Sequence, residues 1–227
     1  MRRNEGNQEG RKLKDPLFRR VRKHAEKRIR FEDHIPTRQE RTDAYREFYR
    51  LERLMVERYH RKGDSGLRVA KAGAIILDVL LEEIFNAAER TLPDNFRSIH
   101  KSVTLVALGG YGRGEISPYS DLDILLLYPD QKETEVVRSY QKTFTEEMLY
   151  PLWDLGLKVG HASRTVRQAL EEAQREPKSK NAFLECRRVC GSAQTLRRFT
   201  RKFRPLYHLK NPEDYIESQI AIQRERR

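Results

Sequence analysis

The sequence lacks the features of a membrane-spanning or disulfide-stabilised protein. Across its 227 residues no apolar run reaches the roughly 18 residues of a spanning helix, and the longest candidate, Ala72–Leu81, is interrupted by Asp78. The basic N-terminal residues are followed by no apolar stretch, so we expect no secretory signal there. The only cysteines are Cys186 and Cys190. Two such ligands are too few for a zinc site, so we expect free thiols in a reducing cytoplasm.

Positive charge is abundant overall, but the middle of the chain has little of it. The formal net charge is +12, and residues 1–50 hold 16 Lys and Arg against 9 Asp and Glu. Residues 178–227 hold 13 against 5, whereas residues 51–177 hold 17 against 20. The basic ends fit either solvated tails or a binding surface for a polyanion. No motif of stacking aromatic side chains accompanies them, so we do not expect a nucleic-acid partner.

Hydrophobic periodicity divides the chain into four parts. We expect a basic, disordered or loosely helical tail over 1–35, a helical lead-in over 36–98, a sheet-containing core over 99–165 and a C-terminal helical segment over 166–227. The final charged helical pattern has no terminal cap. This favours a chain that continues beyond Arg227 in a longer protein.

The expected elements follow from apolar spacing and turn residues. Short apolar runs predict strands at Val103–Leu108, Leu122–Tyr128 and Leu155–Ala162. A first helix begins after Thr37, whose spacing to Glu40 is that of a capping box. Further helices are predicted at Leu67–Thr91, Lys132–Leu152, Thr165–Arg175, Asn181–Cys190, Ala193–Phe203 and Pro212–Arg227. The predicted fold is therefore α/β in the broad sense (α+β): a small mixed β-sheet core with flanking helices before and after it.

The stretch GGYGRGEISPYSDLDILLLY, residues 109–128, carries the clearest chemistry. Asp121 and Asp123 are two apart in a strand, so both carboxylates point to one face and repel each other unless a cation compensates them. Magnesium suits such a pair, because it binds few carboxylates and leaves room for phosphate oxygens. Upstream, Gly109 and Gly110 let the backbone approach a ligand, and Arg113 adds a donor for phosphate. The pattern predicts a site for a triphosphate and a bridging metal ion.

Two common nucleotide-binding motifs are absent. The glycine spacing is not that of a dinucleotide-binding fingerprint, and Ser117-Pro118 follow where a long helix should begin. A P-loop is excluded as well, because the stretch has no Gly-Lys-Ser/Thr. What remains is a strand, a Gly-Gly pair, ten residues, and a second strand that begins with Asp-Leu-Asp.

This arrangement resembles the active-site signature of the DNA polymerase β nucleotidyltransferase superfamily. Within that superfamily, the fuller string is similar to the N-terminal catalytic domain of bacterial PII uridylyltransferases. Two further blocks resemble the same family: LWDLGLKVGHASRT at 152–165 and FLECRRVCG at 183–191. The resemblance covers about residues 100–200 and weakens outside them.

The resemblance implies a magnesium-dependent cytoplasmic enzyme that transfers UMP from UTP to a tyrosine of the PII nitrogen-regulatory protein and releases pyrophosphate. It assigns Asp121 and Asp123 to catalysis and metal binding. It assigns nucleotide or phosphate binding to Gly109, Gly110, Arg113, Ser120, His161 and Arg164. For His161 a structural role at a strand end is an equal alternative. We expect Glu185 and Arg187 to form an ion pair on a helix rather than to contact substrate.

The sequence also departs from the family pattern. Family members are usually longer, with a His-Asp phosphohydrolase domain that removes uridylyl groups and with domains that sense glutamine. This sequence has no His-Asp dipeptide, so we expect neither activity from it; it is either a fragment or a stand-alone transferase with a different acceptor. Superfamily members commonly hold a third carboxylate on the next strand, but residues 155–162 contain none. Asp154 and Glu185 are the nearest candidates, unless the site works without one.

Two alternatives stay open. One is transfer of AMP or another nucleotide to a different protein or small molecule, because no residue pattern distinguishes uracil from adenine. The other is a non-catalytic module that binds a partner through its basic ends. The intact pair Asp121 and Asp123 argues against the second alternative.

Overall fold

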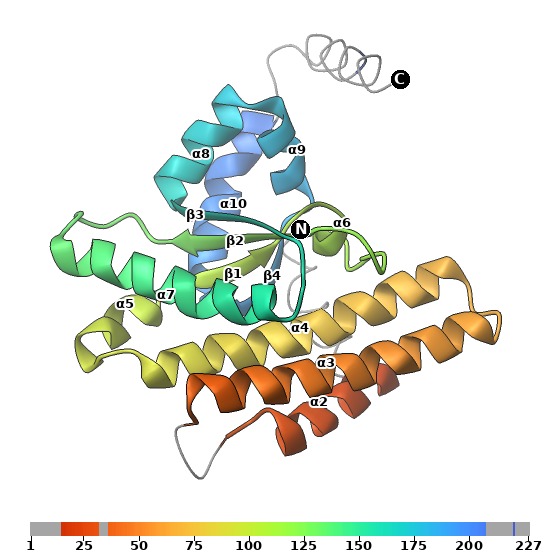
Figure 1. Cartoon of the computed structure of the whole chain (residues 1–227). Helices are drawn as coiled ribbons and strands as arrows, with labels where there is room; N and C mark the ends of the chain where they lie inside the picture. Colours follow the sequence, from red (N-terminus) through yellow and green to blue (C-terminus); the bar gives the residue numbers. More distant parts are fainter. Residues whose placement is uncertain (1–14, 32–35, 208–219, 221–227) are drawn as a thin grey trace.

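A four-stranded mixed sheet lies between two groups of helices (Figure 1). The computed structural model describes residues 15–31, 36–207 and 220. The strand order is β3-β2-β1-β4, with β1 antiparallel to both β2 and β4, and β2 parallel to β3. The strands are β1 (Thr104–Ala107), β2 (Leu122–Tyr128), β3 (Val159–Thr165) and β4 (Arg187–Gly191). The predicted α+β fold with a small mixed sheet is confirmed.

Helices precede the sheet, connect its strands and follow it. Those before β1 are α2 (Pro16–Arg28), α3 (Arg38–Arg61), α4 (Gly66–Thr91), the short 3-10 helix η1 (Asp94–Phe96) and α5 (Arg97–His100). Those after β1 are α6 (Gly109–Gly112), α7 (Glu135–Asp154), α8 (Val166–Arg175), α9 (Pro177–Leu184) and α10 (Ala193–Tyr207). In Figure 1 the bundle of α2, α3 and α4 lies on one side of the sheet and α8 to α10 on the other.

Strand β2 is buried on both faces, which explains its nearly continuous apolar sequence. Its side chains alternate between two apolar clusters. Ile124 and Leu126 belong to the larger cluster, formed with α2, α3, α4 and α7. Leu125 and Leu127 belong to the smaller cluster, formed with α8, α9 and α10. The covering helices leave only the start of β2 open, where Asp123 is exposed.

Local signals at helix starts are confirmed. The Thr37 hydroxyl accepts a hydrogen bond from the Glu40 N–H at 3.2 Å, and the Glu40 carboxylate accepts one from the Thr37 N–H at 2.8 Å. Thr165 forms the same reciprocal box with Gln168 at the start of α8. These caps satisfy N–H groups that lack an acceptor within the helix.

The predicted helix Asn181–Cys190 and the predicted strand Leu155–Ala162 are both corrected. The helix α9 ends at Leu184, and Arg187–Gly191 is instead strand β4, paired with β1. The five residues of β4 are too few for hydrophobic periodicity to distinguish a strand from a helix. Their partner, β1, lies about 80 residues earlier in the chain, so no local signal indicates the pairing. Strand β3 begins later than expected, at Val159, because α7 continues to Asp154 and a turn follows. Neither cysteine forms a disulfide within the described residues, and Cys190 lies in β4.

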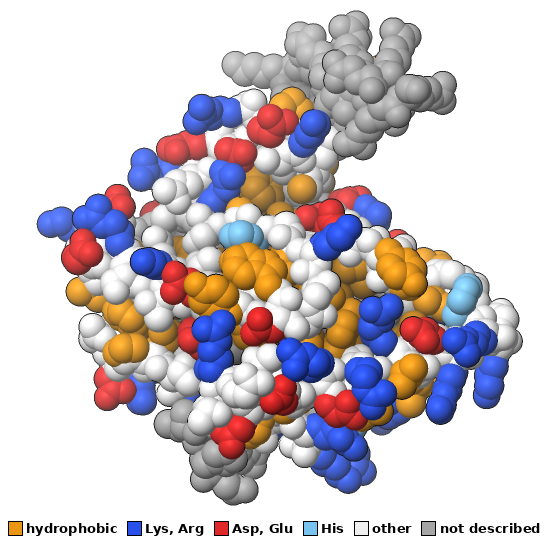
Figure 2. All heavy atoms as spheres, viewed as in Figure 1, with side chains coloured by type: hydrophobic (Ala, Val, Ile, Leu, Met, Phe, Trp, Pro, Cys, Tyr) orange, Lys and Arg blue, Asp and Glu red, His pale blue; other side chains and the backbone are white. Residues whose placement is uncertain are grey.

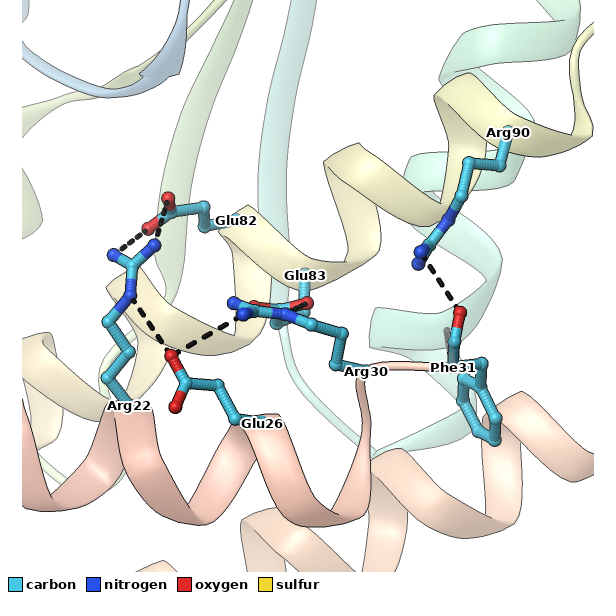
Figure 3. A network of polar contacts seen from close by, with 7 residues as sticks. All are labelled: Arg22, Glu26, Arg30, Phe31, Glu82, Glu83 and Arg90. Carbon is cyan, nitrogen blue, oxygen red and sulfur yellow. Dashed lines mark hydrogen bonds and ion pairs between the residues drawn. The ribbon is translucent and has the colours of Figure 1, made fainter. Parts of the chain in front are cut away.

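The region expected to be a loose basic tail contains an ordered helix over its described part. Helix α2 is capped by Asp15 and buries Phe18, Val21 and Ala25. These three apolar residues form a narrow stripe among many cations, so the sequence shows no clear helical period there. Its cations form ion pairs with the neighbouring helices. Figure 3 shows Arg22 against Glu82, Arg30 against Glu83 and Glu26, and Arg90 donating to the carbonyl of Phe31.

Two further expectations concern the surface and the C-terminal end. The predicted helix Pro212–Arg227 lies outside the described residues, apart from Ile220. Within the described ranges, no helix is both long enough and apolar enough to cross a membrane. On the face shown in Figure 2, Lys and Arg side chains are interspersed with Asp and Glu over most of the surface.

The packing of α2 predicts that it contributes to stability. Phe18 is 2% exposed, so Phe18→Ala should lower the free energy of unfolding by about 3 kcal/mol, as expected for a buried phenylalanine. Exposed Arg19→Ala on the same helix serves as the control and should change it by less than about 0.5 kcal/mol. Urea unfolding measures both. An equally small effect in the two variants would mean that α2 is not part of the folded unit.

Candidate active site

The pairing of β1 with β2 brings the glycine turn beside the aspartates. Ala107 is opposite Ile124, and the next N–H, that of Leu108, donates to the Asp123 carbonyl at 3.0 Å. The chain then turns into α6, with Gly109 at φ +54°, a conformation that favours glycine. A Cβ atom placed on Gly109 would lie 3.8 Å from Asp123 Oδ2. The first residue of the turn and the second carboxylate are therefore neighbours.

Helix α6 is a single turn that begins two residues after the end of β1. Its hydrogen bonds begin with the Gly112 N–H to the Leu108 carbonyl at 2.9 Å and the Arg113 N–H to the Gly109 carbonyl at 3.1 Å. Among the described residues, the N–H groups of Gly109 and Gly110 have no acceptor. Such groups at a helical turn suit the oxygens of a phosphate.

An open cleft of about 750 Å³ lies in front of this turn. It is bounded by the first turns of α4, by the motif residues after β1 and by the start of β2. Its lining residues are Gly66, Leu67, Ala70, Gly110, Tyr111, Arg113, Glu115, Ile116, Ser117, Tyr119, Ser120, Asp121 and Asp123. The structure thus brings Gly110, Arg113, Ser120 and both aspartates together at one cleft, with Gly109 against Asp123.

The two aspartates form a like-charged pair without a nearby cationic partner on their own strand. Both are exposed at the start of β2, on the face shared with Leu125 and Leu127. Partial burial raises the pKa of Asp123, and the neighbouring Asp121 carboxylate raises it further. Asp123 lies against β3 at Gly160, its partner in the parallel register, where any Cβ atom would overlap the carboxylate.

This donor set fits a divalent cation. Carboxylate oxygens are the ligands that magnesium prefers, and a cation would offset the repulsion that raises the Asp123 pKa. Within the described part of the chain, no group of three or more His, Cys, Asp or Glu side chains is arranged to hold a metal. A metal held by Asp121 and Asp123 would therefore complete its coordination with water and with phosphate oxygens of the substrate.

Arg113 lines the cleft but is already paired. Its Nη1 atom lies 2.5 Å from Glu185 Oε2, and its Nε atom lies 3.7 Å from Glu115 Oε2. Its side chain is half exposed, at 51%, so the pair is open to competition from a phosphate in the cleft. The expected ion pair between Glu185 and Arg187 is therefore wrong: Glu185 pairs with Arg113, and Arg187 pairs with Asp78 at 3.0 Å, because the helix expected to carry both residues ends at Leu184.

His161 and Arg164, predicted to face the nucleotide, do not line the cleft. His161 pairs with Ile124, one position after Asp123, so it points to the opposite face of the sheet, where its ring is 6.1 Å from that of Trp153. Arg164 pairs with Leu127 and binds Glu172 of α8 at 2.8 Å. The alternation of β3 turns His161 to the other face, whereas Arg164 shares the face of Asp123 but lies four residues farther along the strand, beside α8.

The two sequence candidates for a third carboxylate, Asp154 at the end of α7 and Glu185, are not among the residues that line the cleft. The carboxylate that does is Glu115, which sequence reasoning passed over. Gly160 was also missed, and a glycine inside the strand pattern LKVGHA was its signal, since it marks close approach of another group.

Comparison with known proteins agrees with this geometry. Residues 89–190 match the nucleotidyltransferase domain family. The chain carries a nucleotidyltransferase domain. It is 32% identical over 170 residues, 74% of its length, to the bifunctional uridylyltransferase/uridylyl-removing enzyme of Rhodospirillum rubrum. It is 38% identical over 127 residues, 53% of its length, to the enzymes of the same name from Burkholderia mallei and Burkholderia pseudomallei. The matched region is 18% and 14% of these relatives, so the chain spans less than a fifth of their length.

Repulsion between Asp121 and Asp123 predicts that the stability gained by removing one charge depends on pH. The folded-state pKa of Asp123 is raised, so its ionisation destabilises the fold as pH rises through that pKa. In metal-free protein, Asp123→Asn should therefore raise the urea midpoint at pH 7, and the gain should vanish at a pH where the carboxylate is protonated in both states. Magnesium should stabilise the wild type and not the variant. A variant less stable than wild type at pH 7 would contradict the repulsion.

The Arg113–Glu185 pair predicts opposite effects for its two members. Arg113→Ala should weaken binding of Mg·UTP or Mg·ATP about 10- to 100-fold, because a charge-assisted bond to phosphate contributes ~1.5–3 kcal/mol. Glu185→Gln should instead tighten binding by up to about fivefold, since it removes a competing exposed ion pair worth at most ~1 kcal/mol. Isothermal titration calorimetry compares both with wild type. Weaker binding in Glu185→Gln would show that Glu185 holds Arg113 in its binding position.

Proposed function

We propose that the protein transfers a nucleotidyl group from a nucleoside triphosphate to a hydroxyl acceptor, with UMP transfer from UTP to a tyrosine of PII as the first choice. The observation that carries the proposal is the placement of Asp121 and Asp123 beside the glycine turn in one cleft. The uridylyltransferase relatives support the choice of UMP and of PII, although the chain spans less than a fifth of their length. Transfer of AMP to another acceptor is the alternative, because the cleft lining contains no contact that distinguishes the two bases.

Each part of the cleft has a distinct task in this proposal. The N–H groups of Gly109 and Gly110 bind phosphate oxygens, and Arg113 leaves Glu185 to bind the triphosphate. Asp121 and Asp123 hold magnesium, which when bound polarises the reacting phosphate and neutralises the leaving pyrophosphate. Glu115, Ser120 and the exposed Tyr119 also line the cleft.

A tyrosine acceptor suits a site with two carboxylates. A phenol has a pKa near ~10, well below that of an aliphatic alcohol, so it needs less help to lose its proton. The attacking phenol oxygen forms a bond to the α-phosphorus while the bond to the leaving pyrophosphate breaks, and the phenol proton is released to water. His161, on the other face of the sheet, is not placed to act as base. Asp154 does not line the cleft, so we propose that Asp154→Asn retains more than about a tenth of the transfer rate. Loss of a general base would instead lower that rate ~10²–10⁴-fold.

The test is transfer from labelled UTP or ATP to purified PII at saturating magnesium. Asp121→Asn and Asp123→Asn should each lower the rate about 100-fold or more, because metal stabilisation of a transition state contributes several kcal/mol. Asp43→Asn, an exposed aspartate on α3 outside the cleft, is the matched control and should retain the wild-type rate. Transfer that persists in both cleft variants would refute the mechanism. Labelling by ATP alone would favour the alternative.

A further inference from the structure

A polar network joins three elements beneath the glycine turn, and the proposed chemistry does not use it. It consists of Asp78 of α4, Tyr111 of α6 and Arg187 of β4. Tyr111 and Asp78 are 2% and 4% exposed, and the Arg187 side chain is 16% exposed. The Tyr111 hydroxyl donates to Asp78 Oδ1 at 2.7 Å. Arg187 binds both Asp78 oxygens, each at 3.0 Å.

Arg187 also binds the backbone of the turn itself. Its Nη2 atom donates to the Tyr111 carbonyl at 3.1 Å, and its Nε atom to the Gly112 carbonyl at 3.3 Å. These carbonyls are at the C-terminal end of α6, where a cation is favourable. The opposite end of the same turn presents the N–H groups of Gly109 and Gly110. One guanidinium thus fixes the backbone whose other end adjoins the aspartates.

Packing leaves the turn little freedom to move. A Cβ atom on Gly112 would overlap the Glu185 carbonyl oxygen and would lie 3.0 Å from the Ala107 carbonyl oxygen. The guanidinium carbon of Arg187 lies 5.3 Å from the centre of the Tyr111 ring. Burial and the Asp78 charge hold the pKa of the Tyr111 phenol well above its ordinary value, so the phenol remains a donor.

We propose that Arg187 is a positioning residue for nucleotidyl transfer, holding the glycine turn through the Tyr111 and Gly112 carbonyls while Asp78 orients its guanidinium. The effect of Arg187 on nucleotidyl transfer rests on the proposed function. Its hydrogen bonds to the turn, by contrast, follow from the geometry alone. Lysine cannot replace arginine here, because an ammonium lacks the planar set of donors that reaches two carbonyls and a carboxylate together. A displacement of the turn by about 1 Å is enough to cost ~100-fold in rate.

The experiment compares Arg187→Lys with a matched control, Arg30→Lys. Arg30 also pairs with a buried carboxylate of α4, Glu83 (Figure 3), but neither residue lines the cleft. Hydrogen exchange of the ligand-free proteins measures how well the backbone of the turn is held. Calorimetry with Mg·UTP and Mg·ATP measures the effect on nucleotide affinity. We expect exchange over residues 109–115 to be at least about tenfold faster in Arg187→Lys, and nucleotide binding to be about 10- to 100-fold weaker. Arg30→Lys should leave both unchanged.

Several results would overturn the proposal. They are unchanged exchange at 109–115, faster exchange throughout the chain, or a locally loosened turn with wild-type nucleotide affinity. If Arg187→Lys does not fold, Tyr111→Phe takes its place, since it removes only the hydroxyl bond to Asp78; it should accelerate exchange in the same segment, and normal exchange there would count against the proposal. If the wild type binds neither nucleotide, the proposed function fails, and the exchange data still decide whether Arg187 holds the turn.

Discussion

The antiparallel pairing of β1 with β2 is the constraint on which the site depends. It places Leu108 opposite Asp123 through a backbone hydrogen bond of 3.0 Å, and so fixes where the glycine turn begins relative to the carboxylates. The ten residues between Gly110 and Asp121 only have to lead from the end of one strand to the start of its neighbour. Since antiparallel neighbours meet at such a connection, the glycine turn and the strand that carries the two aspartates become adjacent without any long-range adjustment.

Charge is distributed so that the cleft itself attracts a cation. Asp121, Asp123 and Glu115 line it, while Arg113, the one Lys or Arg among its described lining residues, is neutralised by Glu185. Burial of β2 on both faces leaves only its first residues accessible, which concentrates the like charges at one point. A divalent ion that arrives with a triphosphate would relieve this repulsion, and binding of metal and substrate would then reinforce each other.

Helix α4 links the N-terminal bundle to the cleft. On one side its Glu82 binds Arg22 of α2, and its Glu83 binds Arg30, which follows α2. On another side its Asp78 binds Arg187, and its first turn contributes Leu67 to the cleft wall. The segments before the matched domain are therefore in physical contact with the site. Within residues 15–31, Arg20, Arg22 and Arg30 pair with buried or half-buried carboxylates, which accounts for part of the positive charge of that segment.

The sequence alone determined what local spacing encodes: the capped starts of α3 and α8, the strand β2, the glycine turn and the paired aspartates. Tertiary structure decided whatever depends on a partner far along the chain. Strand β4 exists because β1 offers it an edge, and the narrow apolar stripe of α2 forms a helix because α3 and α4 cover it. The register of β3 on β2 places Gly160 under Asp123 and turns His161 to the other face. A one-residue shift in a strand reverses every side chain, and no local pattern specifies that register.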